Sequence, residues 1–415
     1  MMTNKKKILI IVDSFVPNFS PRMGYLALLL SKRDWVVEVI TTDFWKAASI
    51  YTIKGLEVDV TTVDASCYLD KKLSNISRLW KRMSSMHGEF QSLYEKMKAE
   101  AERKLSAKRF DIILASAAYT PFLADIARSC SEKFEIPWIA DFRDMFEQYP
   151  KLAKGSGIKK KYDDLWNKEQ IRRRSKIIKQ ASACTCVSYE HREILSETHP
   201  NAYCVFNGYD SELYIWDTPT KQDMFRLVFG GKVYKDLLFQ DPSYVFEAIS
   251  ILSKKKLISP SHFCFDLYLS DACQLYIEEF VERYEVQEYV NIFPLMNVEE
   301  FALQIKRSSI CMLFTSEHTT GIMFTKSFEY IGSGRPILSV PDDKGCMNQL
   351  LKKLGAGCSA SSAEEAANFI LGKYQEWLKN GFVLSTADPQ KASVFSRANQ
   401  SEKFEELINQ CLQMK

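Results

Sequence analysis

The chain has 415 residues, of which 46% are hydrophobic and 26% are charged, and its formal net charge is +3. This composition is typical of a soluble globular protein, and the length exceeds what one hydrophobic core usually serves, so we expect two domains. No apolar run approaches the length of a membrane span, and Asp13 ends the first one after five residues, which argues against a secretory signal. We therefore expect a cytoplasmic protein.

Cysteine and histidine spacing bears on metals and disulfides. The eleven cysteines are scattered, and the five histidines show no metal-ligand spacing. Cys184 and Cys186 alternate inside an apparent strand, as small buried hydrophobic side chains do. This pattern predicts neither a zinc site nor a disulfide framework, and we expect no metal.

Short apolar runs alternate with helical patterns along the chain. The predicted strands of the first half are residues 8–12, 36–41, 57–63, 111–115, 138–140, 183–187 and 203–206. Helical patterns lie between them, notably over 22–33, 75–105 and 120–133. The predicted strands of the second half are 226–229, 263–269, 290–293, 310–314, 337–340 and 357–360. Such alternation is typical of a parallel sheet covered by helices on both faces, here formed twice.

A domain boundary is predicted at Asn207-Gly208-Tyr209-Asp210, because Asn-Gly is a strong turn sequence. The polar residues 217–223 have the composition of a linker. We expect domains at 1–207 and 208–390, followed by a C-terminal segment at 391–415. Ligands of open α/β folds bind at the carboxyl ends of the strands, so we expect a cleft between those edges of the two sheets.

Polar side chains cluster where predicted strands end. Asp141, Arg143 and Asp144 follow one strand of the first half, and they could contact a ligand or form an ion pair that ties a loop to the sheet. Lys232 and Lys235 follow a Gly-Gly pair in the second half. Backbone amides and cations at such a turn can bind a diphosphate, although a solvated turn with two surface lysines is the alternative.

The stretch 324–338 predicts a loop, a short helix and a strand. Thr325 can cap the first amides of the helix, and Lys326 and Glu329 lie on one face of it. Gly334 suits the left-handed position that ends a helix. A helix N-terminus with a hydroxyl and a lysine favours an anion such as a diphosphate, and Glu329 could accept hydrogen bonds from a ribose. The alternative is an ordinary capped helix with an internal Lys–Glu pair.

Two stretches are strongly basic. The segment from Lys151 to Lys179 holds eleven basic and three acidic residues, a net charge of +8. Residues 71–82 hold five basic residues and no acid, interleaved with apolar side chains. These are either solvated helix faces or a surface for peripheral contact with anionic lipid, where each cation contributes roughly 1 kcal/mol. We expect no nucleic acid, because no recognised binding motif or aromatic stacking platform accompanies the charge.

Five motifs, in this order, resemble glycosyltransferases of the GT-B fold, and more narrowly the family 4-like sugar transferases of bacterial polysaccharide synthesis. They are Trp138-Ile139-Ala140-Asp141-Phe142-Arg143-Asp144, Val187-Ser188-Tyr189-Glu190, Asn207-Gly208-Tyr209-Asp210, Phe229-Gly230-Gly231-Lys232-Val233-Tyr234-Lys235-Asp236 and the stretch 324–338. The resemblance covers roughly residues 5–380.

The resemblance implies two Rossmann-like, doubly wound parallel-sheet domains facing a cleft, with the last helix, about residues 392–412, packed back on the N-terminal domain. It implies transfer of a sugar from a nucleotide sugar, such as a UDP- or GDP-sugar, to a hydroxyl of a glycan or lipid-linked acceptor. The reaction would retain configuration and need no metal or other cofactor.

The resemblance also implies roles for particular residues. The donor-binding set is Gly231, Lys232, Lys235, Gly321, Thr325, Lys326, Ser327 and Glu329. The catalytic and acceptor-side set is Asp141, Arg143, Asp144 and Glu329.

Two departures from the family pattern leave alternatives open. Many family 4 enzymes carry two glutamates eight positions apart, and here Gly321 stands eight residues before Glu329. The N-terminal loop, residues 13–24, lacks the usual pair of glycines. The alternatives are a non-catalytic GT-B protein that binds a nucleotide or a partner, and a nucleotide-sugar epimerase, which normally needs more carboxylates and histidines.

Overall fold

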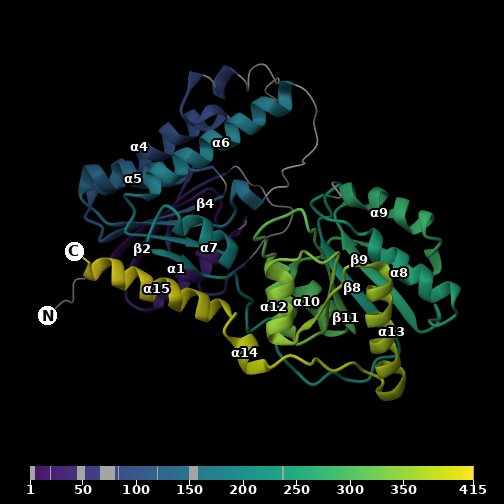
Figure 1. The fold of residues 1–415 in the computed structure, drawn as a ribbon. Helices are drawn as coiled ribbons and strands as arrows, with labels where there is room; N and C mark the ends of the chain where they lie inside the picture. Colours follow the sequence, from purple (N-terminus) through teal and green to yellow (C-terminus); the bar gives the residue numbers. More distant parts are fainter. Residues whose placement is uncertain are drawn as a thin grey trace. The chain divides into compact units, whose positions relative to one another are not determined.

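In a computed structural model the chain forms two compact units, each built on one parallel sheet (Figure 1). The structure describes residues 5–18, 20–43, 52–65, 80–82, 84–118, 120–148, 158–235 and 238–414, without the side chains of 158–160. Unit 1 comprises Met1–Phe146, Lys154–Phe206 and Ala398–Lys415, and unit 2 comprises Glu147–Ala153 and Asn207–Arg397. The basic residues predicted at 71–78 and 151–157 lie outside the described residues.

The sheet of unit 1 has seven parallel strands in the order β3-β2-β1-β4-β5-β6-β7. Their bounds are β1 (Lys7–Val12), β2 (Val36–Thr42), β3 (Asp59–Val63), β4 (Ile112–Ala117), β5 (Trp138–Phe142), β6 (Ala183–Cys186) and β7 (Ala202–Cys204). Each coincides with a predicted strand to within a few residues. The inner strands β1, β4 and β5 are buried on both sides because helices cover both faces of the sheet, whereas the edge strand β3 is largely exposed.

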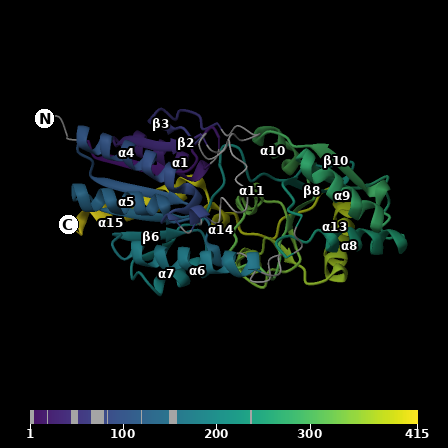
Figure 2. The same cartoon turned by 90° about the horizontal axis from the view of Figure 1, so that it is seen from above.

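Two layers of helices cover this sheet (Figures 1 and 2). One layer holds α4 (Gln91–Ala107), α5 (Phe122–Phe134), α6 (Ile158–Ile178) and α7 (Tyr189–Ser196). The other holds α1 (Pro21–Lys32) and α15 (Arg397–Gln413). The predicted helical pattern at 75–105 corresponds in part to α4, which begins only at Gln91 after the short helix η1 (Gly88–Phe90).

The predicted single helix over 392–412 is wrong in its extent. The segment forms α14 (Pro389–Ser393) and, after a break at 394–396, α15. The break lies where Tyr209 pairs with Ser396 in an isolated parallel bridge, because a residue engaged in a bridge cannot also continue a helix. Phe404, Leu407 and Ile408 of α15 belong to the same buried cluster as the apolar face of α1.

The sheet of unit 2 has six parallel strands in the order β10-β9-β8-β11-β12-β13. Their bounds are β8 (Phe225–Gly231), β9 (Phe263–Leu269), β10 (Val290–Pro294), β11 (Ile310–Phe314), β12 (Ile337–Val340) and β13 (Gly357–Ser359). Helices α8 (Ser243–Lys254), α9 (Asp271–Arg283) and α13 (Ala363–Asn380) share one core with the sheet. Helices α10 (Val298–Lys306), α11 (Thr325–Ser333) and α12 (Cys346–Leu354) contact β8, β11 and β12, respectively, and α14 contacts α11. The predicted fold, two doubly wound α/β domains, is thereby confirmed.

Strand order places a switch point in each sheet. In unit 1 the chain builds outward from β1 through β2 and then returns to β4 on the other side of β1. In unit 2 it builds outward from β8 and returns to β11. Ligands of open α/β sheets bind outside the carboxyl ends of the strands at such switch points. The segments that follow β1 and β8 are therefore the expected positions of a ligand site.

The cysteines give a test of these cores. The ten described cysteines are free thiols, and eight of them are buried. Burial raises the pKa of Cys130, Cys186 and Cys311 to about 12. Because the thiolate is the reactive form, we predict that thiol reagents label these three slowly at neutral pH and rapidly after denaturation. Mass spectrometry of labelled peptides measures both rates. Rapid labelling of Cys311 in the native protein would contradict the packing of unit 2.

Candidate functional site

Two predicted residues of unit 2 lie side by side at its switch point. Gly231 ends β8 with a φ of 138°, a conformation that side chains rarely adopt. A Cβ at this position would lie 3.0 Å from Cε of Lys326, in the first turn of α11. Glycine therefore lets the backbone at the end of β8 approach the lysine closely. The structure brings Gly231 and Lys326 together, although they are far apart in the sequence.

The N-terminus of α11 carries no side-chain cap. Phe324 is the N-cap residue, in extended conformation, and Thr325 is the first residue of the helix. The prediction that Thr325 caps the helix is therefore wrong, because its hydroxyl enters the helix one position too late to accept from the first-turn amides. The N–H of Ser327 donates to the carbonyl of Phe324 at 3.1 Å, and the Phe324 side chain offers no acceptor to the amides of Thr325 and Lys326. An open helix N-terminus of this kind favours an anion.

Aromatic packing holds Lys326 at this place. Its ammonium lies 4.6 Å from the ring centre of Phe301 in α10, and 3.8 Å from Oε2 of Glu329. Phe301 in turn packs flat against Gly230, where a Cβ would lie 2.4 Å from the ring. A cation over an aromatic face is attracted by the ring quadrupole, so Phe301 orients the lysine toward the end of β8. We call Gly231, Phe301, Lys326 and Glu329 the α11 site.

The sequence did not single out Phe301. In the sequence it is an apolar position of an amphipathic helix, and most such positions hold ordinary core residues. The contact that distinguishes it, with Gly230 and Lys326, joins three segments of the chain and is visible only in the fold.

The remaining predicted donor residues occupy different environments. Lys232 is exposed just after β8, whereas the ammonium of Lys235 lies 5.7 Å from the ring centre of Tyr276 in α9. Gly321 is buried with a φ of 68°, so this position also favours glycine. The Ser327 side chain is fully buried, and its hydroxyl has no hydrogen-bond partner among the described residues. Lys232 and Lys235 are both exposed, and Lys232 directly follows Gly231 of the α11 site in the chain.

At the switch point of unit 1, a second cluster joins two strand ends. The guanidinium of Arg143, just after β5, pairs with the carboxylate of Asp13, just after β1. The backbone N–H of Arg143 donates to the carbonyl of Ala117 at 2.9 Å, which fixes the loop against β4. Burial raises the pKa of Asp13, Arg143 opposes this shift, and the neighbouring charge of Asp144 adds to it. We call Asp13, Arg143 and Asp144 the Asp13 cluster.

In the sequence, Asp13 stands out only as the acid that ends the first apolar run, not as a candidate site residue. An acid directly after a buried parallel strand is a usable signal, because that position lies at the ligand-binding edge of the sheet.

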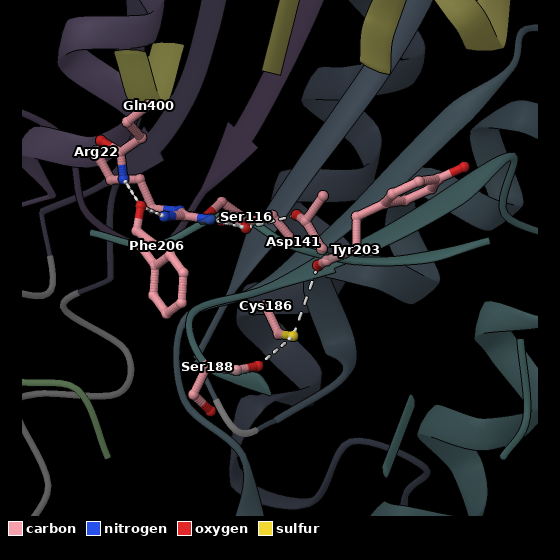
Figure 3. A network of polar contacts seen from close by, with 9 residues as sticks. Arg22, Ser116, Asp141, Cys186, Ser188, Tyr203, Phe206 and Gln400 are labelled. Atoms are coloured by element: carbon pink, nitrogen blue, oxygen red, sulfur yellow. Dashed lines mark hydrogen bonds and ion pairs between the residues drawn. The ribbon is translucent and has the colours of Figure 1, made fainter. Parts of the chain in front are cut away.

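Asp141 has a different place from its neighbours in the motif. Its side chain has no exposed surface, and four donor atoms surround its carboxylate (Figure 3). Arg22 Nη2 donates at 2.9 Å, and the hydroxyls of Ser116 and Thr185 each donate at 2.7 Å. A carboxylate enclosed in this way has no surface open to solvent. Its acceptor-side role stays a prediction, and the contacts present here join β4, β5, β6 and α1.

Arg22 extends this network beyond the sheet. Its Nη1 donates to the carbonyl of Phe206 at 3.0 Å, and the amide of Gln400 donates to the same carbonyl at 2.6 Å (Figure 3). The guanidinium also lies 4.7 Å from the ring centre of Phe404 in α15. One buried side chain thus connects α1, β5, α15 and the last residue of unit 1 before the chain enters unit 2.

Comparison with solved structures identifies the architecture. No protein-family model matches the sequence, and no curated protein matches it. HepE of Anabaena in complex with UDP and glucose is similar over 98% of this chain and 100% of its own, with a TM-score of 0.67 and 13% identity. The fold is GT-B.

Two further GT-B structures show the range of activities on this fold. The sucrose-phosphate synthase of Thermosynechococcus elongatus matches over 99% of this chain and 100% of its own, with a TM-score of 0.63 and 13% identity. The UDP-GlcNAc 2-epimerase of Methanocaldococcus jannaschii matches over 97% and 99%, with a TM-score of 0.54 and 11% identity. The similar structures include glycosyltransferases as well as epimerases.

We predict that Asp141→Asn destabilises unit 1 by about 3 kcal/mol, because it leaves the buried Arg22 without its counter-charge. Hydrogen exchange of peptides from β4, β5 and β6 measures the loss of stability. The control is Asp34→Asn, which removes an exposed pair with Lys5 and should change stability by less than about 1 kcal/mol. Equal effects of the two substitutions would contradict a structural role for the buried pair.

Proposed function

We propose that this chain is a glycosyltransferase that binds a nucleoside diphosphate sugar at the α11 site and transfers the sugar to an acceptor hydroxyl. The observation that carries the proposal is the open N-terminus of α11, with Lys326 held against Gly231 at the switch point of unit 2. Related folds that contain UDP, glucose or UDP-glucose support a nucleotide sugar as the ligand class.

The charges of the α11 site suit the leaving group of this reaction. The first amides of α11 and the ammonium of Lys326 would hold the diphosphate, with Lys232 beside them. Preorganised donors and cations stabilise the negative charge that develops on the diphosphate as the bond to the sugar breaks. Glu329, one turn further along the same face, would accept hydrogen bonds from the ribose hydroxyls. The donor nucleotide we favour is UDP or GDP.

The Asp13 cluster would serve the acceptor, a glycan or a lipid-linked sugar. In a retaining reaction, a phosphate oxygen of the leaving group takes the proton of the acceptor hydroxyl, and Arg143 and Asp144 position the acceptor. The acceptor O–H bond and the sugar–phosphate bond break as the new glycosidic bond forms. If the reaction inverts configuration, Asp13 is the candidate base, because its raised pKa makes it a better proton acceptor than an ordinary aspartate.

Two other functions compete with this proposal. Gly321, where many family 4 enzymes have a glutamate, favours a protein that binds a nucleotide without catalysis. The epimerase fold relatives favour isomerisation of a nucleotide sugar. Incubation with a panel of nucleotide sugars and acceptors separates the three. A glycosylated acceptor supports the transferase, an epimeric nucleotide sugar supports the epimerase, and tight nucleotide binding without any turnover supports the non-catalytic protein.

We predict that Lys326→Ala and Glu329→Ala each weaken the binding of UDP or GDP by about tenfold or more, because each removes a charge-assisted contact. Isothermal titration calorimetry measures the dissociation constants. Lys353→Ala is the matched control, since this lysine is exposed in the last turn of α12. Unchanged affinity in both site variants would show that the nucleotide does not bind at the α11 site.

We predict that Asp13→Asn lowers the turnover of sugar transfer but leaves the affinity for the donor nucleotide unchanged. If Asp13 is the base, it must be ionised. Its raised pKa then makes wild-type activity fall, as the pH is lowered, at a higher pH than for an ordinary aspartate. This acid limb should disappear in Asp13→Asn. A variant that keeps full turnover would remove Asp13 from the mechanism and favour the retaining route without a protein base.

A further inference from the structure

The outer side of α6 is a continuous exposed stripe. Its members follow the spacing of one helix face and are Lys161, Asp164, Leu165, Lys168, Arg172, Lys176 and Lys179, the last just beyond the helix. The opposite side of the helix, which includes Arg174, Ile177 and Ile178, is buried. In Figure 2, α6 lies at the side of α5 away from α4, and α5 contacts both. The packing of the helix thus fixes which side chains meet solvent.

Positive charge predominates on this stripe because it contains one acid, and arginines bind the acids beside it. Both oxygens of Glu169 are bound by Arg172 and Arg173 at 2.7–2.8 Å. Asp163 accepts from Arg82 at 2.9 Å. Lys161, Lys168, Lys176 and Lys179 form no ion pair with the described residues, and Asp164 is the one exposed acid among the stripe's seven members. These four lysines therefore carry charge that no ion pair with a described residue neutralises, and Asp164 is the one acid on the same stripe.

Large apolar side chains are exposed on and beside the same helix. Leu165 is 57% exposed within the stripe, and Trp80 and Met86 of the neighbouring segment are 71% and 55% exposed. That segment is fastened to α6, because Arg82 stacks 5.1 Å from the ring centre of Trp166 and Arg173 donates to the carbonyl of Met86. Indole favours the membrane–water interface, so an exposed tryptophan beside a cationic stripe suits contact with a bilayer.

We propose that the stripe of α6, with Leu165, Trp80 and Met86, docks unit 1 on an anionic lipid bilayer. Lysines attract an anionic lipid surface through their charge, and the apolar side chains insert at the level of the headgroups. No helix in the described part of the chain is long and apolar enough to span a bilayer, so the contact is peripheral and reversible. This surface is separate from the α11 site and does not depend on the proposed transfer.

The test is sedimentation of the full-length protein with phosphatidylcholine vesicles, with and without phosphatidylserine, in the absence of nucleotide. We expect binding only to the vesicles with phosphatidylserine, and weaker binding at higher salt. The variant Lys161→Gln/Lys168→Gln/Lys176→Gln should bind about a hundredfold more weakly, since each lysine contributes about fivefold. Trp80→Ala and Leu165→Ser should each weaken binding severalfold.

The control variant is Lys353→Gln/Lys379→Gln/Lys403→Gln, which changes the net charge equally at exposed lysines elsewhere. It should bind vesicles nearly as well as the wild type. Equal losses in the two triple variants would overturn the proposal, because net charge rather than this stripe would then be responsible. Absence of binding to anionic vesicles, or tight binding of RNA in their place, would also overturn it.

Failure of this proposal and failure of the transferase proposal give different results. UDP affinity of the stripe variant should equal that of the wild type, because the substituted lysines lie outside the α11 site. If the stripe variant loses vesicle binding and still binds UDP, the stripe is a lipid-binding surface, whichever reaction the protein catalyses. Intact vesicle binding in a protein that binds no nucleotide contradicts only the proposed function.

Discussion

The buried carboxylate of Asp141 is the constraint on which unit 1 depends. An isolated charge in a protein interior costs several kcal/mol, so it persists only where donors surround it. Here the donors come from three directions, with Ser116 on β4, Thr185 on β6 and Arg22 on α1. The carboxylate therefore sets the register of three neighbouring strands and the position of α1 at once. Arg143 and Asp144 of the Asp13 cluster come directly after β5, so the position of this strand determines where they lie.

The same network fixes the chain where it leaves unit 1. Arg22 and Gln400 both donate to the carbonyl of Phe206, so the outgoing segment and the returning helix α15 share one anchor. On the unit 2 side of the boundary, Tyr209 donates to the carbonyl of Phe395, and Arg397 donates to that of Tyr209. Outgoing and returning segments are thus bonded within each unit. Loss of the Arg22–Asp141 pair would therefore disturb the sheet and both segments in which the chain passes from one unit to the other.

Much of the fold could be predicted from the sequence, because strands and helices are local patterns. Every strand of both sheets was found, since parallel strands covered on both faces are short, nearly continuous apolar runs. The end of β8 at Gly231 and the start of α11 next to Lys326 were also predicted, because glycine pairs and helix starts have local signatures. The roles of the two residues in donor binding stay predictions. The failures share a cause. Arg22 and Asp141 are 119 residues apart, and nothing near Arg22 indicates a buried partner. Phe301 likewise acquires its role only through Gly230 and Lys326.

The α11 helix shows why local rules also failed within a well-predicted element. Its N-terminus lacks the cap that the sequence suggested, yet its C-terminal half is tightly held. A Cβ at Gly332 would lie 2.3 Å from the ring of Tyr209, and one at Gly334 would lie 2.6 Å from the ring of Trp216. These aromatic side chains come from the segment that enters unit 2, so close packing of the chain there fixes the helix in place.

Stability at one end of α11 permits an open site at the other. A capped helix would satisfy its own amides and leave less for an anion, whereas an uncapped helix without other support would fray. Packing at Gly332 and Gly334 supplies that support away from the site. The first turn can then keep its amides and Lys326 available for a ligand. In the same way, the burial of Asp141 fixes the strand from which Arg143 and Asp144 follow, so that in both units rigid packing lies behind the strand ends that carry the candidate site residues.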